Sequence, residues 1–126
     1  MPELLSMIHL YGIANCDTVK KARAWLTDRG VACRFHDFKK EGVDSAALRA
    51  WCEALGWEKL LNRQGTTWRK LDAATQQGVT DSASARQLMS LQPSLIKRPV
   101  VNWGEGTNQS LTVGFDAAVW AEQLKD

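Results

Sequence analysis

Apolar runs and helical spacings alternate along the first part of the chain. Residues 7–12 form an apolar run that ends at a glycine, which is typical of a strand covered on both faces. Residues 19–29 then carry apolar side chains at helical spacing, and Asp17 and Thr18 are both good residues to cap such a helix. Residues 31–38 alternate again and predict a second strand. The chain therefore begins with a strand, a helix and a strand.

The middle of the chain is predicted to be almost entirely helical, because its apolar residues keep helical spacing between capping and terminating residues. In chain order we expect a polar loop at residues 39–42, a helix between Asp44 and Gly56, a helical turn at 57–61, a short helix that Thr66 or Thr67 caps and that ends at 71, and a helix between Asp81 and Pro93.

The last part of the chain predicts two strands and a helix. In order these are a strand within residues 96–103, a turn at 104–108, a short strand at 109–113 and a helix at 117–124 that Asp116 caps. Proline has no N–H to donate to a strand partner, so Pro99 should stand at the entrance of its strand and not at the centre. The two strands lie close enough in sequence to form a hairpin.

The element order is therefore βαβ, a helical insert, and ββα. A right-handed crossover makes the first two strands parallel neighbours. We expect an α/β protein with a four-stranded mixed sheet and helices on its faces, which is the thioredoxin-like fold. The 126 residues suit one domain, so we expect a single domain over residues 1–126 with a mainly helical insert at about 55–93.

Composition excludes several classes of protein. Hydrophobic residues make up 44% and charged residues 24%, as in a globular domain, and the net charge of +2 with no cluster of Lys and Arg argues against nucleic-acid binding. The charge-free run at residues 4–16 is too short to cross a membrane, and an acid at position 3 does not suit a secretory signal. Three cysteines without metal-type spacing predict free thiols in a reducing compartment, the cytoplasm, and no metal site.

Cys16 stands out as a candidate nucleophile. It lies at the exit of the first strand and just before the first helix, where unpaired N–H groups and the helix dipole favour a thiolate over a thiol. Its neighbours Asn15, Asp17 and Thr18 are polar and turn-forming, which argues against simple core packing. Val19 occupies the position where a Cys-x-x-Cys motif would have its second thiol, so no resolving cysteine lies in the same turn.

The other reactive residue types have simpler interpretations. Cys33 falls on an apolar strand face and Cys52 on an apolar helical stripe, so both should pack in the core, although either is an internal candidate for a resolving thiol. His36 is a candidate base for Cys16, but a structural role is the better interpretation, as it is for His9 inside the first strand.

Two sequence positions offer cations to an anion. Arg98 precedes Pro99, which holds residue 98 in extended geometry and presents a guanidinium at a strand entrance. Arg63 lies in a loop before a short helix and is also able to reach an anion. Arg69 and Lys70 fall on a helix face that we expect to be solvated.

Three segments of the chain together resemble the ArsC/Spx family, most closely its YffB-type branch. They are LYGIANCDTVKKA at residues 10–22, LLNRQGTTWRKL at 60–71 and PSLIKRPVV at 93–101. The resemblance covers nearly the whole chain in the right order. It implies a thioredoxin-like fold with a helical insert, a cis peptide bond at Pro99 and a nucleophilic cysteine at Cys16.

The resemblance also implies an activity. In the arsenate reductases of the family three arginines hold the oxyanion; Arg98 matches one of them, Asn62 stands in place of another, and no arginine lies near residues 113–115. The resemblance to the YffB-type branch implies a glutathione-dependent thiol reductase, an oxidoreductase with one nucleophilic cysteine. The alternatives are an arsenate reductase linked to glutathione and glutaredoxin, and an Spx-like regulator that binds RNA polymerase without turnover.

In the first of these interpretations glutathione is a co-substrate and no cofactor is tightly bound. Cys16 attacks, the backbone N–H groups of residues 17–19 stabilise the thiolate, and Arg98 and Pro99 hold a carboxylate or the main chain of glutathione. Asn15, Asp17 and Thr18 border the same site, and Lys20 and Arg63 are candidates for a second carboxylate. We expect a monomer, with glutaredoxin as a further partner and with neither nucleic acid nor membrane.

Overall fold

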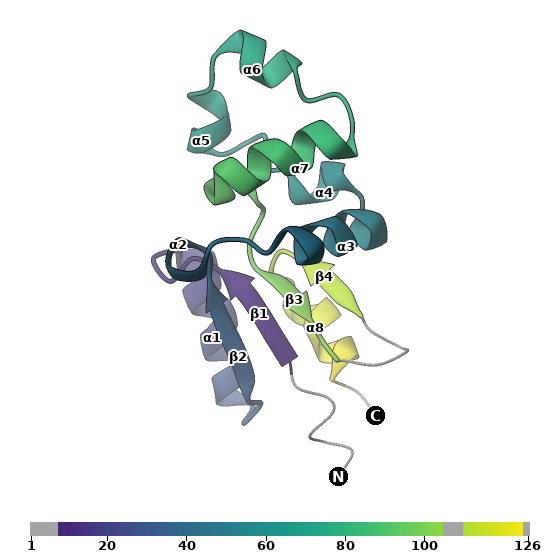
Figure 1. Ribbon diagram of the computed structural model, residues 1–126. Helices are drawn as coiled ribbons and strands as arrows, with labels where there is room; N and C mark the ends of the chain where they lie inside the picture. Colours follow the sequence, from purple (N-terminus) through teal and green to yellow (C-terminus); the bar gives the residue numbers. More distant parts are fainter. Residues whose placement is uncertain (1–7, 105–109, 125–126) are drawn as a thin grey trace. The chain divides into compact units, whose positions relative to one another are not determined.

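The computed structural model describes residues 8–104 and 110–124 of the chain (Figure 1). The chain divides into two compact units, which are described separately. The first, called the sheet unit, contains the described residues up to Phe38 and those from Arg98 onward. The second, called the helical unit, is Lys39–Lys97. The expectation of a single domain with an insert at about 55–93 stays a prediction.

Four short strands form the sheet of the sheet unit. They are β1 (Ile8–Gly12), β2 (Cys33–Asp37), β3 (Val100–Asn102) and β4 (Leu111–Val113). Their order across the sheet is β2-β1-β3-β4, with β2 parallel to β1 and the other two pairs antiparallel. This connectivity confirms the predicted thioredoxin-like fold, with βαβ and ββα halves in one mixed sheet.

One face of the sheet is covered by α1 (Asp17–Asp28) and α8 (Ala117–Gln123), both drawn behind the strands in Figure 1. Leu10 of β1, paired with Val101 of β3, lies in the core on this face. Trp120 of α8 is fully buried there. Its ring makes edge-to-face contacts with three aromatic side chains, Trp25, Trp103 and Phe115, at centroid distances of 5.8, 5.0 and 4.7 Å. These contacts tie both helices to the sheet.

Alternation along the strands places His9, Tyr11 and His36 on the other face. The His36 ring stacks on Tyr11 with centroids 4.5 Å apart, and His9 Nδ1 lies 2.9 Å from His36 Nε2. At that distance one imidazole nitrogen donates a hydrogen bond and the other accepts it. The bond to its strand neighbour favours the structural interpretation of His36, and likewise that of His9.

The boundaries between residues 16 and 42 differ from the sequence prediction in three places. The second strand is shorter than residues 31–38, and the expected loop at 39–42 is wrong, because α2 (Phe38–Glu41) forms a helical turn there. The N-cap of α1 is Cys16, with extended φ and ψ of −128° and 125°, and not Asp17 or Thr18. Both of those polar residues already belong to the helix. Residue 7, residues 105–108 of the predicted turn and residue 109 of the predicted strand lie outside the described residues, and the last strand is observed at Leu111–Val113.

The helical unit contains five α-helices and a 3₁₀ turn after α2. They are α3 (Ser45–Leu55), α4 (Trp57–Leu60), α5 (Thr66–Arg69), α6 (Ala73–Gln77), α7 (Ser82–Leu91) and η2 (Pro93–Leu95). Asp44 and Asp81 cap α3 and α7 as predicted, and Asp81 forms a capping box with Ser84. The sequence pattern did not indicate α6, and Gly65 stands at the N-cap of α5 in place of the two threonines.

A short antiparallel pairing joins the two ends of the middle segment of the helical unit. Leu61 and Ile96 form an isolated bridge. Asn62 N–H donates to the Leu95 carbonyl at 2.8 Å, and Lys97 N–H donates to the Leu60 carbonyl at 2.7 Å. This pairing explains why the predicted strand at 96–103 begins only at Val100, since the backbone of Ile96 and Lys97 is already used here.

Within the ranges 8–104 and 110–124, no helix has the length and apolar character needed to span a membrane. The same residues bring together no group of three His, Cys, Asp or Glu side chains that could hold a metal ion.

Candidate functional site

Cys16 lies in the connection between β1 and α1, and close packing fixes the helix turn that follows it. Gly12, the last residue of β1, sits against the fully buried side chain of Val19 in the first turn of α1. A Cβ at position 12 would lie 2.8 Å from Val19 Cγ2, so only glycine allows this approach. The Cys16 carbonyl accepts the first bond of the helix, from Lys20 N–H at 2.9 Å. The half-buried thiol is therefore held at the helix N-terminus.

The surroundings of the Cys16 thiol lower its pKa from the ordinary value of 9.0. Burial acts in the opposite direction and is the largest single influence, but hydrogen-bond donors outweigh it: the Val19 N–H, the Arg98 side chain and its positive charge, and the Thr18 N–H. Each of these stabilises a negative sulfur. The arrangement favours the thiolate, which is the nucleophilic form of cysteine.

Arg98 reaches the thiol from the entrance of β3. The peptide bond between Arg98 and Pro99 is cis, as the family resemblance implied. Pro99 is fully buried, and its carbonyl accepts a hydrogen bond from Gly114 N–H at 2.9 Å. The strand begins at Val100, so the prediction that the proline stands at the strand entrance is confirmed. These contacts anchor the backbone from which the half-buried Arg98 side chain extends to Cys16.

The other two cysteines have the opposite electrostatic environment. All three thiols are free. Burial raises the pKa of Cys33, against a smaller opposing effect of the Arg23 charge. Burial also raises the pKa of Cys52, which packs in the helical unit with 6% of its surface exposed. Cys16 is thus the one cysteine whose surroundings favour ionisation.

The structure brings together part of the set of residues predicted for the site. Thr18 and Arg98 contact the sulfur of Cys16, and Pro99 anchors Arg98. The side chains of Asn15, Asp17 and Lys20 are exposed around the same turn, and their predicted binding roles stay predictions.

Arg63 belongs to the helical unit, where it lines a cavity of about 200 Å³. Its guanidinium lies 5.2 Å from the ring centroid of Trp57 and 5.9 Å from that of Trp68. Lys97 and Glu58 line the same cavity, and neither was predicted from the sequence as a site residue. No local signal marks them, because the pairing of residues 60–62 with 95–97 brings distant segments together.

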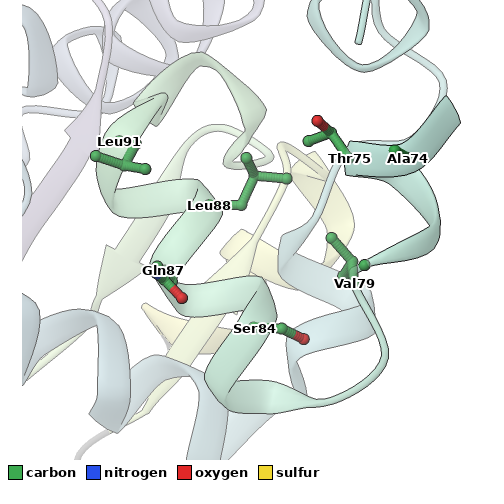
Figure 2. Close-up of a pocket in the computed structure, with 8 residues that line it drawn as sticks. Ala74, Thr75, Val79, Ser84, Gln87, Leu88 and Leu91 are labelled. Atoms are coloured by element: carbon green, nitrogen blue, oxygen red, sulfur yellow. The ribbon is translucent and has the colours of Figure 1, made fainter. Parts of the chain in front are cut away.

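A second cavity of about 200 Å³ lies between α6 and α7 of the helical unit (Figure 2). Leu88 and Leu91 reach it from α7, and Thr75 and Val79 border it from the side of α6. Its lining side chains carry no charge and no thiol. It therefore offers none of the chemistry found around Cys16.

Comparison with known proteins decides the family of the chain. A model of the ArsC family matches residues 11–123. The chain belongs to the ArsC family. The predicted resemblance is thereby confirmed, and this ArsC protein carries its free thiol and Arg98 on the thioredoxin-like sheet described above.

Three similar proteins show how far the likeness extends. The solved structure of the "YFFB (PA3664) protein" has 48% sequence identity and a TM-score of 0.86, covering 94% of this ArsC chain and 100% of that one. The solution structure of an arsenate reductase (ArsC) related protein from Brucella melitensis has 47% identity and a TM-score of 0.70, covering 92% of both chains. An uncharacterized protein of Haemophilus influenzae is 41% identical over 95 residues, which is 75% of this chain and 82% of that protein. This chain is an arsenate reductase-like member of its family.

Proposed function

We propose that this ArsC-family protein is a glutathione-dependent thiol reductase that uses Cys16 as its single nucleophile. The observation that carries the proposal is the set of donors around the sulfur. The N–H groups of Thr18 and Val19 and the side chain of Arg98 lower the pKa of Cys16, while burial raises the pKa of the other two cysteines. A thiolate stabilised at neutral pH is what an attacking cysteine requires.

The proposed reaction has two thiol–disulfide exchanges. The Cys16 thiolate attacks the glutathione sulfur of a mixed disulfide R–S–S–G. The disulfide bond breaks, and R–S⁻ leaves as a thiolate and takes a proton from solvent. A second glutathione thiolate then attacks the resulting Cys16–S–S–G, which releases oxidised glutathione and restores the Cys16 thiolate. The sum is R–S–S–G plus GSH giving R–SH plus GSSG, with glutathione as the two-electron reductant.

The other members of the proposed site are those that the sequence and the family resemblance suggest. Arg98 and the backbone beside Pro99 hold a carboxylate or the main chain of glutathione. Lys20, exposed in the first turn of α1, and Arg63 of the helical unit are proposed for a second carboxylate. Asn15 and Asp17 border the entry of the substrate.

An external thiol resolves the mixed disulfide in this proposal. Val19 stands where a neighbouring cysteine would be needed, and its backbone N–H serves the Cys16 thiolate instead. The raised pKa values of Cys33 and Cys52 make both poor attacking groups at neutral pH. Glutathione itself, or glutaredoxin as a further partner, supplies the second thiol. The chemistry suits a glutathione-rich, reducing compartment such as the cytoplasm, with the protein acting as a monomer.

Arsenate is the less favoured substrate. A multiply charged oxyanion needs several charge-assisted donors in a preformed pocket. Arg98 is the cation that bonds to the Cys16 sulfur and helps to lower its pKa. Residues 113–115, with Gly114 at positive φ, contain no cation. Asn62 offers a neutral amide where the reductases of the family have an arginine.

The test is steady-state turnover of a cysteine–glutathione mixed disulfide, with formation of oxidised glutathione followed through glutathione reductase and NADPH. The parent protein should turn over, the variant Cys16→Ser should not, and the matched variant Cys33→Ser should retain most of the activity. Intact-mass measurement should find one glutathione on the parent and none on Cys16→Ser. Turnover by Cys16→Ser equal to that of the parent, or turnover of arsenate but not of the disulfide, would disprove the proposal.

A further inference from the structure

The cavity around Arg63 collects opposite charges without pairing them. Its lining contains two cations, Arg63 and Lys97, one carboxylate, Glu58, and the amides of Asn62 and Gln64. Within residues 8–104 and 110–124, none of the three charged groups forms an ion pair with another residue. Two cations and one anion therefore face the same space of about 200 Å³, each open to an outside partner.

The backbone of this cavity is built rigidly. The pairing of Leu61 with Ile96 holds both segments together, and both side chains are buried. Asn62 Oδ1 accepts a hydrogen bond from Gln64 N–H at 3.1 Å. This bond closes a tight turn with Arg63 at its centre. The loop that presents Arg63 and the segment that presents Lys97 are therefore fixed to one another.

The Arg63 side chain is held in place by two indole rings. Its guanidinium lies 5.2 Å from the ring centroid of Trp57 and 5.9 Å from that of Trp68, within the range of cation–π attraction. Contact with ring faces leaves the guanidinium N–H groups available at the edge of the plane. A planar fork of donors in this state is suited to a carboxylate, which it binds with two parallel hydrogen bonds.

We propose that this cavity binds the head group of an α-amino acid, that is, an ammonium and a carboxylate on one carbon atom. Arg63 and Lys97 bind the carboxylate, and Glu58 accepts hydrogen bonds from the ammonium. A phosphate or other dianion would meet the repulsion of Glu58. The mixed charge of the cavity instead matches a zwitterion. The choice of ligand rests on the proposed function, because the γ-glutamyl end of glutathione carries such a head group.

The experiment measures non-covalent binding to the full-length Cys16→Ser variant, so that no mixed disulfide forms. The probes are S-methylglutathione and two matched analogues. The glutaryl analogue lacks only the ammonium, and the 4-aminobutyryl analogue lacks only the α-carboxylate. Chemical shifts of the indole N–H signals of Trp57 and Trp68, assigned through the Trp→Phe variants, report occupancy beside Arg63.

Loss of one charge should weaken binding by about three- to fivefold, the size of an ion pair in an open cavity. Glu58→Gln should weaken the binding of S-methylglutathione but not that of the glutaryl analogue. Arg63→Gln and Lys97→Gln should weaken the binding of S-methylglutathione but not that of the 4-aminobutyryl analogue. Lys59→Gln, which removes an exposed charge next to Glu58 but outside the cavity, should change neither.

Equal binding of all three probes to the Cys16→Ser protein would overturn the proposal. Equal effects of Lys59→Gln and Lys97→Gln on binding would also overturn it. The reaction of unmodified Cys16 with oxidised glutathione is measured in parallel. No indole shift with normal reaction of Cys16 would reject the head-group site and leave the proposed function standing. Head-group binding without any mixed disulfide at Cys16 would support the site and reject the reductase.

Discussion

Replacing Arg98 with methionine should slow the reaction of Cys16 with iodoacetamide at neutral pH and speed it at high pH. Methionine keeps much of the apolar stem of arginine but removes the donor and the charge that help to lower the pKa of Cys16. The pKa of the thiol therefore rises in the variant. A smaller fraction is thiolate at neutral pH, but each thiolate is more basic and more nucleophilic.

The size of the effect follows from the environment of the sulfur. A hydrogen bond to a charged group contributes roughly 1.5–3 kcal/mol when shielded from water. Cys16 is only half-buried, so we discount this to about 1 kcal/mol, or about a fivefold loss of thiolate. Nucleophilicity recovers a little under half of that on a logarithmic scale. The net rate should fall about 2- to 3-fold at neutral pH and rise about 2-fold where both proteins are fully ionised.

The assay is the rate of carbamidomethylation of Cys16 across the pH range, read by peptide mass spectrometry. Lys21→Met is the matched control, since it removes an exposed positive charge from the same helix without a role in holding the sulfur. The control profile should overlie that of the parent. The reasoning is refuted if the two rate profiles of Arg98→Met and the parent coincide, or if Lys21→Met shifts its profile as far.

Three further predictions concern the same region. Brief alkylation with less than one equivalent of reagent at pH 7 should label Cys16 before Cys33 or Cys52, and predominant label on either of these would contradict the site. Gly12→Ala should lower the free energy of unfolding in urea by about 1–3 kcal/mol, because its methyl group meets a buried side chain; Gly104→Ala, with open space around it, should change it little. The free energy of unfolding of the parent, relative to Cys16→Ser, should increase as pH rises from the lowered folded-state pKa of Cys16 toward 9.0. This added stability should be lost as pH falls through the folded-state pKa. A difference between the two proteins that does not change with pH would contradict a stabilised thiolate.

Much of the fold was predictable because its signals are local. Asp44, Asp81 and Asp116 cap helices as their positions indicated, and each accepts a backbone N–H in the first turn. The spacing of apolar residues also predicted the buried stripe of the first helix and the order of the strands along the chain. The cap of α1 was wrong because the extended backbone of Cys16 already fills the capping position, which releases Asp17 and Thr18 into the helix.

What the sequence did not show depends on contacts between distant segments. The sequence pattern predicted Ile96 and Lys97 as the start of a strand. They pair instead with residues 60–62 in the helical unit. The same pairing joins Lys97 to Glu58 and Arg63 around one cavity, and no spacing rule could indicate that. Around the nucleophile the reverse holds, because the Thr18 and Val19 donors lie two and three residues from Cys16 in one helix turn.

The edge-to-face arrangement of aromatic rings around Trp120 has a spectroscopic consequence. Indoles fixed at 5.0 and 5.8 Å with nearly perpendicular planes couple their electronic transitions, so Trp25, Trp103 and Trp120 should give the protein an intense near-ultraviolet circular dichroism. Trp57 and Trp68 of the helical unit stand beside a guanidinium and partly in water. Their fluorescence should be emitted at longer wavelength than that of the buried Trp103 and Trp120. Dichroism then follows the unfolding of the sheet unit without any added dye.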